Sequence, residues 1–139
     1  MKHARAFASW DGVSGDAPKP RSMSSPQTAM APETLVQRGI DAYNAHDAEA
    51  FASVYAADME LHDLGGALYL SGREALRERY AQLFASAPNV HVEIVRRIVV
   101  GNNVIDEERI THTPSGRDAH VAVIYEIRDG AIARAWVSR

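Results

Sequence analysis

The chain has 139 residues, of which 46% are hydrophobic and 24% charged, the size and composition of one globular domain. Its net charge of −3 and pI near 6.0 provide no basic field, so we expect no nucleic-acid partner. Cysteine is absent, which excludes disulfides and thiolate chemistry, and no run approaches the roughly 20 apolar residues that a membrane span needs.

Residues 1–31 are rich in proline, serine and glycine without apolar periodicity, and they are predicted to be a flexible tail ahead of a domain over 32–139. The apolar stretch at 6–10 is shorter than the roughly 7–15 residues of a signal-peptide core, so we expect a cytoplasmic protein. Met23 and Met30 lie just ahead of the periodic region, and the sequence leaves open which methionine starts the native chain.

Apolar spacing predicts three helices in the first half of the domain. A stripe at spacings of four and three, beginning after Pro32, predicts a helix over 32–45. Asp47 is the expected N-cap of a second, short helix that runs to about residue 58. A third helix ends before Pro88, and Ser71 and Glu74 have the spacing of a capping box at its start.

Alternation of apolar and polar residues predicts a sheet. Met59, Leu61 and Asp63 share one face of a strand that a Gly-Gly pair at 65–66 ends. Turn sequences then separate four runs, over 89–100, 103–113, 118–128 and 131–138, which predict a long, curled antiparallel meander. Helices followed by a meander indicate an α+β domain with the helices on one face of the sheet.

This order of elements resembles the nuclear-transport-factor-2-like superfamily, and in particular its SnoaL-like and ketosteroid-isomerase-like proteins. The resemblance rests on Tyr-Asn-Ala-His-Asp at 43–47, Ser-Gly at 71–72 and the stretch IYEIRDGAI at 124–132. It implies a cone-like α+β barrel, in which three N-terminal helices pack in a strongly curved, mostly antiparallel sheet. It also implies a deep and mostly apolar pocket between sheet and helices.

The resemblance implies that Asp63 is a catalytic base, because the aspartate base of ketosteroid isomerase follows the end of the helical hairpin at the same spacing. The predicted strand over 103–113 carries Asp106, Glu108, Ile110 and His112 on one face. The alignment turns this face toward the pocket and places Glu108 deepest in it. Burial there would raise the pKa of a carboxyl group and suit it to acid–base chemistry. The alternative is that Asp106 and Glu108 face solvent.

On the predicted strand over 118–128 the alignment turns His120 and Ile124 toward the pocket. His120 is then a candidate proton shuttle beside a carboxylate, although a lone histidine on a sheet is more often solvated. The two oxyanion donors of the steroid isomerase align with Gly39 and Ile124, neither of which has a side-chain donor. We therefore reject a close copy of that mechanism.

Aromatic residues on the helical faces are candidates for either core or pocket: Tyr43, Tyr55, Tyr80 and Phe84. Tyr80 also aligns with a tyrosine that lines the isomerase pocket. A metal site of Asp63 or Glu108 with His112 and His120 is the other use of these residues, but no HxH or HExxH pattern supports it. We therefore expect neither a metal nor a cofactor.

Together these features predict an enzyme of the isomerase, cyclase, dehydratase or epoxide hydrolase kind that acts on a small, mainly apolar molecule. The alternative is a non-catalytic ligand-binding or protein-interaction domain of the same fold. The strand over 118–128 is apolar on both faces, and Trp136 is expected on the outer face. These residues predict a homodimer through the outer face of the sheet.

Overall fold

A computed structural model of the protein describes residues 30–138. The helices are α2 (Pro32–Asn44), α3 (Ala48–Ser53) and α4 (Arg73–Ser86). The strands are β1 (Tyr55–Asp63), β2 (Leu68–Ser71), β3 (His91–Val100), β4 (Asn103–Thr111), β5 (Ala119–Arg128) and β6 (Ala131–Val137). Residues 1–29 of the predicted tail lie outside the described residues. No helix in the described range is long and apolar enough to cross a membrane.

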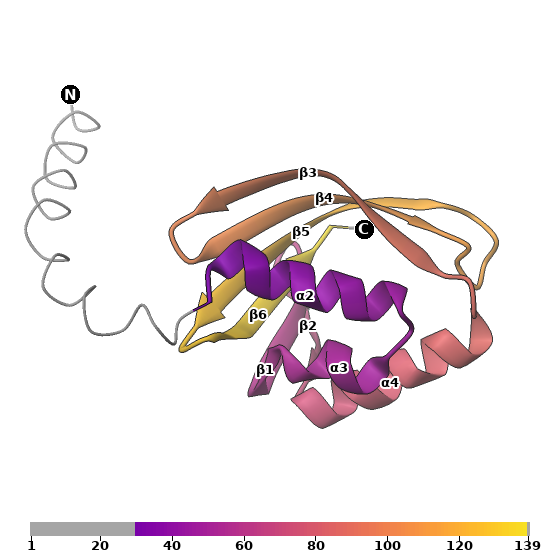
Figure 1. Cartoon of the computed structure of the whole chain (residues 1–139), viewed down its shortest axis with the longest axis horizontal. Helices are drawn as coiled ribbons and strands as arrows, with labels where there is room; N and C mark the ends of the chain where they lie inside the picture. Colours follow the sequence, from indigo (N-terminus) through magenta and orange to yellow (C-terminus); the bar gives the residue numbers. More distant parts are fainter. Residues whose placement is uncertain (1–29, 139) are drawn as a thin grey trace, which may run out of the picture. The chain divides into compact units, whose positions relative to one another are not determined.

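The six strands form one open, curled sheet in the order β2-β1-β6-β5-β4-β3. Strands β3 to β6 are the predicted antiparallel meander, and β1 joins it by a parallel pairing with β6. Figure 1 shows α2, α3 and α4 on the concave side of this sheet. The predicted α+β class, with three helices against a curved and mostly antiparallel sheet, is therefore confirmed.

The second helix is shorter than predicted. Asp47 is its N-cap, as expected, and its side chain accepts a hydrogen bond from the Ala50 amide at 3.0 Å. The helix ends at Ser53, however, and Tyr55 already belongs to β1. The Val54 carbonyl accepts a hydrogen bond from the Ile132 amide, so pairing with β6 takes the chain away from the helix at this point.

The start of α4 also differs from its prediction. Gly72, not Ser71, is the N-cap, and no side chain caps the helix. Gly72 has a φ of 94°, a backbone conformation that glycine adopts without strain, so the sharp turn into α4 depends on this residue. The strand β2, which brings Tyr69 beside β1, was not predicted because it is only four residues long.

The helices are fastened to the sheet by polar and aromatic contacts. The Asn44 side chain donates to the Val92 carbonyl at 3.0 Å and accepts from the Val92 amide at 2.8 Å, which pins the end of α2 to β3. Phe51 from α3 lies between Tyr43 of α2, at 5.7 Å between ring centroids, and Tyr80 of α4, at 4.7 Å. These rings join the three helices along the side that faces the sheet.

Candidate functional site

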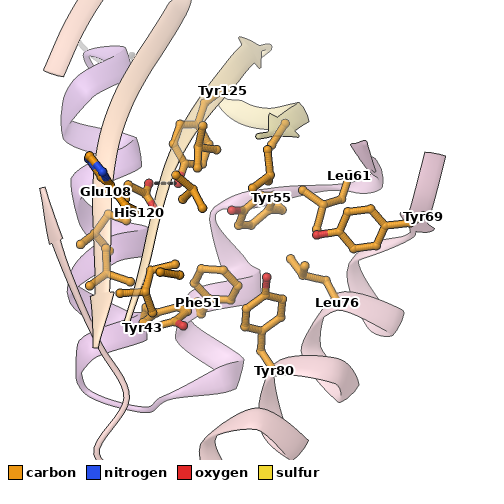
Figure 2. A pocket seen from close by; sticks show the side chains of 18 residues that line it. Tyr43, Phe51, Tyr55, Leu61, Tyr69, Leu76, Tyr80, Glu108, His120 and Tyr125 are labelled. Atoms are coloured by element: carbon orange, nitrogen blue, oxygen red, sulfur yellow. Dashed lines mark hydrogen bonds between the residues drawn. The ribbon is translucent and has the colours of Figure 1, made fainter. Parts of the chain in front are cut away.

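A cavity of about 470 Å³ lies between the concave face of the sheet and the helices, within the size range of small-molecule pockets. All five tyrosines of the chain line it. Figure 2 shows the labelled tyrosines and Phe51 arranged around this space, with Glu108 on the β4 side. The remaining lining residues are Ile40, Leu61, Leu76, Val92, Ile110, Ala119, His120, Val121, Val123, Ala135 and Val137.

Glu108 is the carboxylate of this cavity, and only 4% of the residue is exposed. Its Oε2 atom accepts a hydrogen bond from the Tyr125 hydroxyl at 2.8 Å, drawn as a dashed line in Figure 2. Burial raises the pKa of Glu108 to about 7, and the nearby Asp106 charge raises it further, against the opposing effects of the Tyr125 hydrogen bond and Arg97. The carboxyl group can therefore both take up and release a proton near neutral pH.

Three tyrosine hydroxyls are available to a ligand. In the range 30–138, no protein group is hydrogen-bonded to the hydroxyls of Tyr43, Tyr55 or Tyr80, yet no buried polar side-chain atom there lacks a partner. These hydroxyls must therefore open onto the cavity. Burial raises the pKa of Tyr43 to about 12 and raises the pKa values of Tyr55 and Tyr80 above their usual range. All three are thus protonated donors at neutral pH.

Asp106 shares the face of Glu108 but serves a structural pairing. It is fully buried, and Arg97 of β3 contacts it through two nitrogens, at 2.6 Å to Oδ1 and 2.8 Å to Oδ2. Arg97 also donates to Gln37 of α2 at 2.9 Å, so this bidentate pair ties the helix to the sheet. The alternative that Asp106 and Glu108 face solvent is wrong for both.

The predicted facing of β5 was wrong by one residue. Antiparallel pairing sets Glu108 opposite Val121 and Val104 opposite Tyr125, so Val121 and Tyr125 face the cavity. Ile124 therefore lies on the outer face. The backbone of β5 brings His120 to the cavity wall, but its half-exposed ring is bonded at 2.7 Å to Glu107 on the opposite face of β4 from Glu108.

The other predicted site residues are divided between the cavity and its surroundings. Ile110 lines the cavity, whereas Phe84 is buried without lining it. His112 is exposed in the turn after β4, at a φ of 56°. Asp63 pairs in register with Val137, on the face that carries the cavity, but it is half-buried at the end of β1 and does not line the cavity. The expectation that Asp63 and Glu108 share one cavity is not met.

Sequence reasoning missed three residues that matter most to this site. Tyr125 follows Ile124, which was predicted to face inward, and was therefore expected on the outer face. Tyr69 belongs to a strand that was not predicted, and Arg97 was not considered. The tyrosine content carried a usable signal, because the hydroxyl group of a buried tyrosine needs a hydrogen-bond partner. No group of three or more His, Asp or Glu side chains within the described residues is placed to hold a metal ion.

Solved structures with the same fold support the assignment of the superfamily. A Novosphingobium aromaticivorans structure, described as an uncharacterized cystatin fold protein, is 26% identical with a TM-score of 0.74, over 80% of this chain and all (100%) of that chain. A Catenulispora acidiphila protein with a ketosteroid isomerase-like fold, in complex with trimethylamine, is 25% identical with a TM-score of 0.63, over 78% and 85% of the two chains.

An NTF2-like protein of unknown function from Cytophaga hutchinsonii has 17% identity and a TM-score of 0.67, over 79% of this chain and 90% of that chain, which shows a shared fold alone. No curated protein matches the sequence. The SnoaL-like domain matches residues 36–135, a range that holds most of α2, all of α3 and α4, and nearly the whole sheet. The chain therefore belongs to the SnoaL-like family, as the resemblance of its elements predicted.

Proposed function

We propose that this protein is an enzyme that transfers protons to and from a small, mainly apolar molecule bearing a carbonyl or hydroxyl group. The observation that carries the proposal is Glu108, a carboxyl group with a pKa of about 7 at the wall of an aromatic cavity. Membership of the SnoaL-like family, together with the isomerase-like fold of solved neighbours, supports a small organic ligand in this space.

In the proposed step, ionised Glu108 takes a proton from the carbon next to the substrate carbonyl. The C–H electron pair then forms a carbon–carbon double bond, and the carbonyl electron pair moves to its oxygen. The hydroxyls of Tyr55 and Tyr80, which line the cavity, would donate to that oxygen. They would replace the two oxyanion donors of the steroid isomerase, whose aligned positions here are Gly39 and Ile124. In a β,γ-unsaturated substrate, return of the proton to the γ-carbon moves the double bond into conjugation and gives an isomer. In a β-hydroxy substrate, delivery of the proton to the β-hydroxyl releases it as water and gives a dehydration.

Asp63 and His120 take no part in this step. Asp63 does not line the cavity, and the His120 ring is bonded to Glu107 on the other face of the sheet. Glu108 would then act alone as base and acid, with Tyr125 holding one of its oxygens. This shortage of a second acid–base group is the observation that favours the alternative, a ligand-binding domain without turnover.

The test is exchange of the α-hydrogens of cyclohexanone for deuterium in D₂O, followed by NMR, with hydrolysis of cyclohexene oxide as a second probe. The protein should accelerate at least one reaction over buffer, and exchange should rise with pH through about 7 as Glu108 ionises. Glu108→Gln should remove the acceleration. Tyr55→Phe and Tyr80→Phe should each lower it by about 100-fold, the usual effect of losing one oxyanion donor.

Glu107→Gln is the matched control, because Glu107 is the adjacent residue of β4 and its partners Arg96 and His120 lie on the outer side. It should retain the activity. Binding of the probes without turnover in the unsubstituted protein would favour the binding domain, and the absence of both would refute the proposal.

A further inference from the structure

A second hollow, of about 540 Å³, adjoins the Glu108 cavity between β2 and α4. The two spaces share part of their walls, formed by Tyr43, Leu61, Tyr69 and Tyr80. The residues that line only the second hollow include polar side chains along one side of α4, namely Arg79, Gln82 and Ser86. An apolar chamber therefore lies directly beside a polar one.

Arg79 gives the second hollow a positive charge. Its guanidinium carbon lies 5.8 Å from the centre of the Tyr69 ring, and the residue is otherwise exposed. Among residues 30–138 no carboxylate lies within ion-pair distance of it, whereas Arg77, two residues earlier in the same helix, is paired with Glu74 at 2.9 Å. The Arg79 charge reaches the shared wall, because it opposes the burial that raises the pKa of Tyr80.

The two spaces differ in the charge that they accept. No lysine or arginine of the described chain lines the Glu108 cavity, so an anion there would be unpaired and close to a carboxylate. Figure 2 shows Tyr69 and Tyr80 on the side of the cavity opposite Glu108, and these two tyrosines are part of the wall shared with the Arg79 hollow. The site is therefore negative or neutral at one end and positive at the other.

We propose that the Arg79 hollow is a second subsite, which binds the carboxylate end of an elongated substrate whose apolar body occupies the Glu108 cavity. The inference rests on the proposed function, because it takes the Glu108 cavity as the place of the substrate body. A guanidinium matches the planar shape of a carboxylate, and Gln82 and Ser86 line the same hollow with further polar groups. Because one end of the site is apolar and the other carries a positive charge, the substrate would bind in one direction only.

Calorimetry with three probes tests this inference. 6-Phenylhexanoate, 6-phenylhexanamide and 6-phenylhexylammonium share a phenylhexyl chain and differ in the head group, which is negative, neutral and positive in turn. At pH 6, where Glu108 is mostly protonated, the carboxylate should bind three- to fivefold more tightly than the amide, the effect of a partly exposed ion pair. The preference should shrink in high salt. Arg79→Gln should abolish it while changing the amide affinity less than twofold.

Arg77→Gln is the matched control, since Arg77 lies on the same helix but lines neither space, and it should keep the preference for the carboxylate. Melting temperatures of both variants check that each remains folded. Equal binding of carboxylate and amide, or strongest binding of the ammonium, would overturn the second subsite and leave the proposed function intact. Failure of all three probes to bind would count against the Glu108 cavity itself and so against both proposals.

Discussion

At the scale of single residues, β4 holds two buried carboxylates in two different states. Asp106 is compensated by the guanidinium of Arg97, whereas Glu108, two residues later on the same face, has a phenol as its hydrogen-bond partner. A phenol neutralises no charge, so the cost of removing water from the ionised Glu108 is left in place and appears as its raised pKa. Because Arg97 is hydrogen-bonded to Asp106 and not to Glu108, Glu108 keeps the raised pKa that suits it to proton transfer.

This difference predicts how stability depends on pH. The unfolded chain releases the Glu108 proton near pH 4.5, whereas the folded protein keeps it until about pH 7. Stability should therefore fall as pH rises from about 4.5 to 7 and level off above. Glu108→Gln lacks this loss, so its stability should lie within about 1 kcal/mol of that of the unsubstituted protein at pH 5 and exceed it at pH 8 by up to about 3 kcal/mol.

Urea unfolding at pH 5, 6, 7 and 8 measures this dependence. Glu93→Gln is the control, because Glu93 is exposed on β3 and should leave the slope of stability against pH unchanged. Curves for Glu108→Gln and the unsubstituted protein that run parallel from pH 5 to 8 would show that Glu108 is not desolvated.

At the scale of elements, local sequence signals predicted the ranges of the helices and strands well. They did not predict how strands distant in the sequence pair and which face each side chain takes. Helices α2 and α4 and all four meander strands lie within a few residues of their predicted ranges, because periodicity and turns are local properties of the chain. The facing of β5 is not local. Both of its faces are apolar, so the pattern could not distinguish them, and its pairing with β4 sets the facing of Tyr125 and Ile124.

The two helix starts show the same contrast and predict a difference between two substitutions. The Asp47 side chain caps α3, so Asp47→Ala should cost about 1 kcal/mol of unfolding free energy. Ser71 has the sequence spacing of a capping residue but makes no cap, so Ser71→Ala should change stability by less than about 0.5 kcal/mol. Chemical denaturation measures both, and an equal loss in the two variants would mean that Ser71 caps α4 in solution.

At the scale of the whole molecule, the outer face of the sheet carries an apolar row. Pairing in register places Ile98, Ile105, Ile124, Trp136 and His62 side by side across five neighbouring strands. Charged pairs flank this row, with Arg96 and Glu107 on one side and Glu126 and Arg134 on the other. A central apolar row with a polar border is the composition of a protein interface rather than of a solvated sheet face.

We therefore expect a homodimer in which this face meets its copy, because a row that crosses the sheet can pack on the same row after a twofold rotation. Ile98→Glu combined with Ile124→Glu should give a monomer, since each substitution would bury an unpaired charge in the interface. Val99→Glu is the matched control: Val99 is 42% exposed but pairs with Val104, on the other face. Sedimentation equilibrium should give twice the 15.2 kDa chain mass for the unsubstituted protein and for the control. A monomer at micromolar concentration before any substitution would refute the dimer.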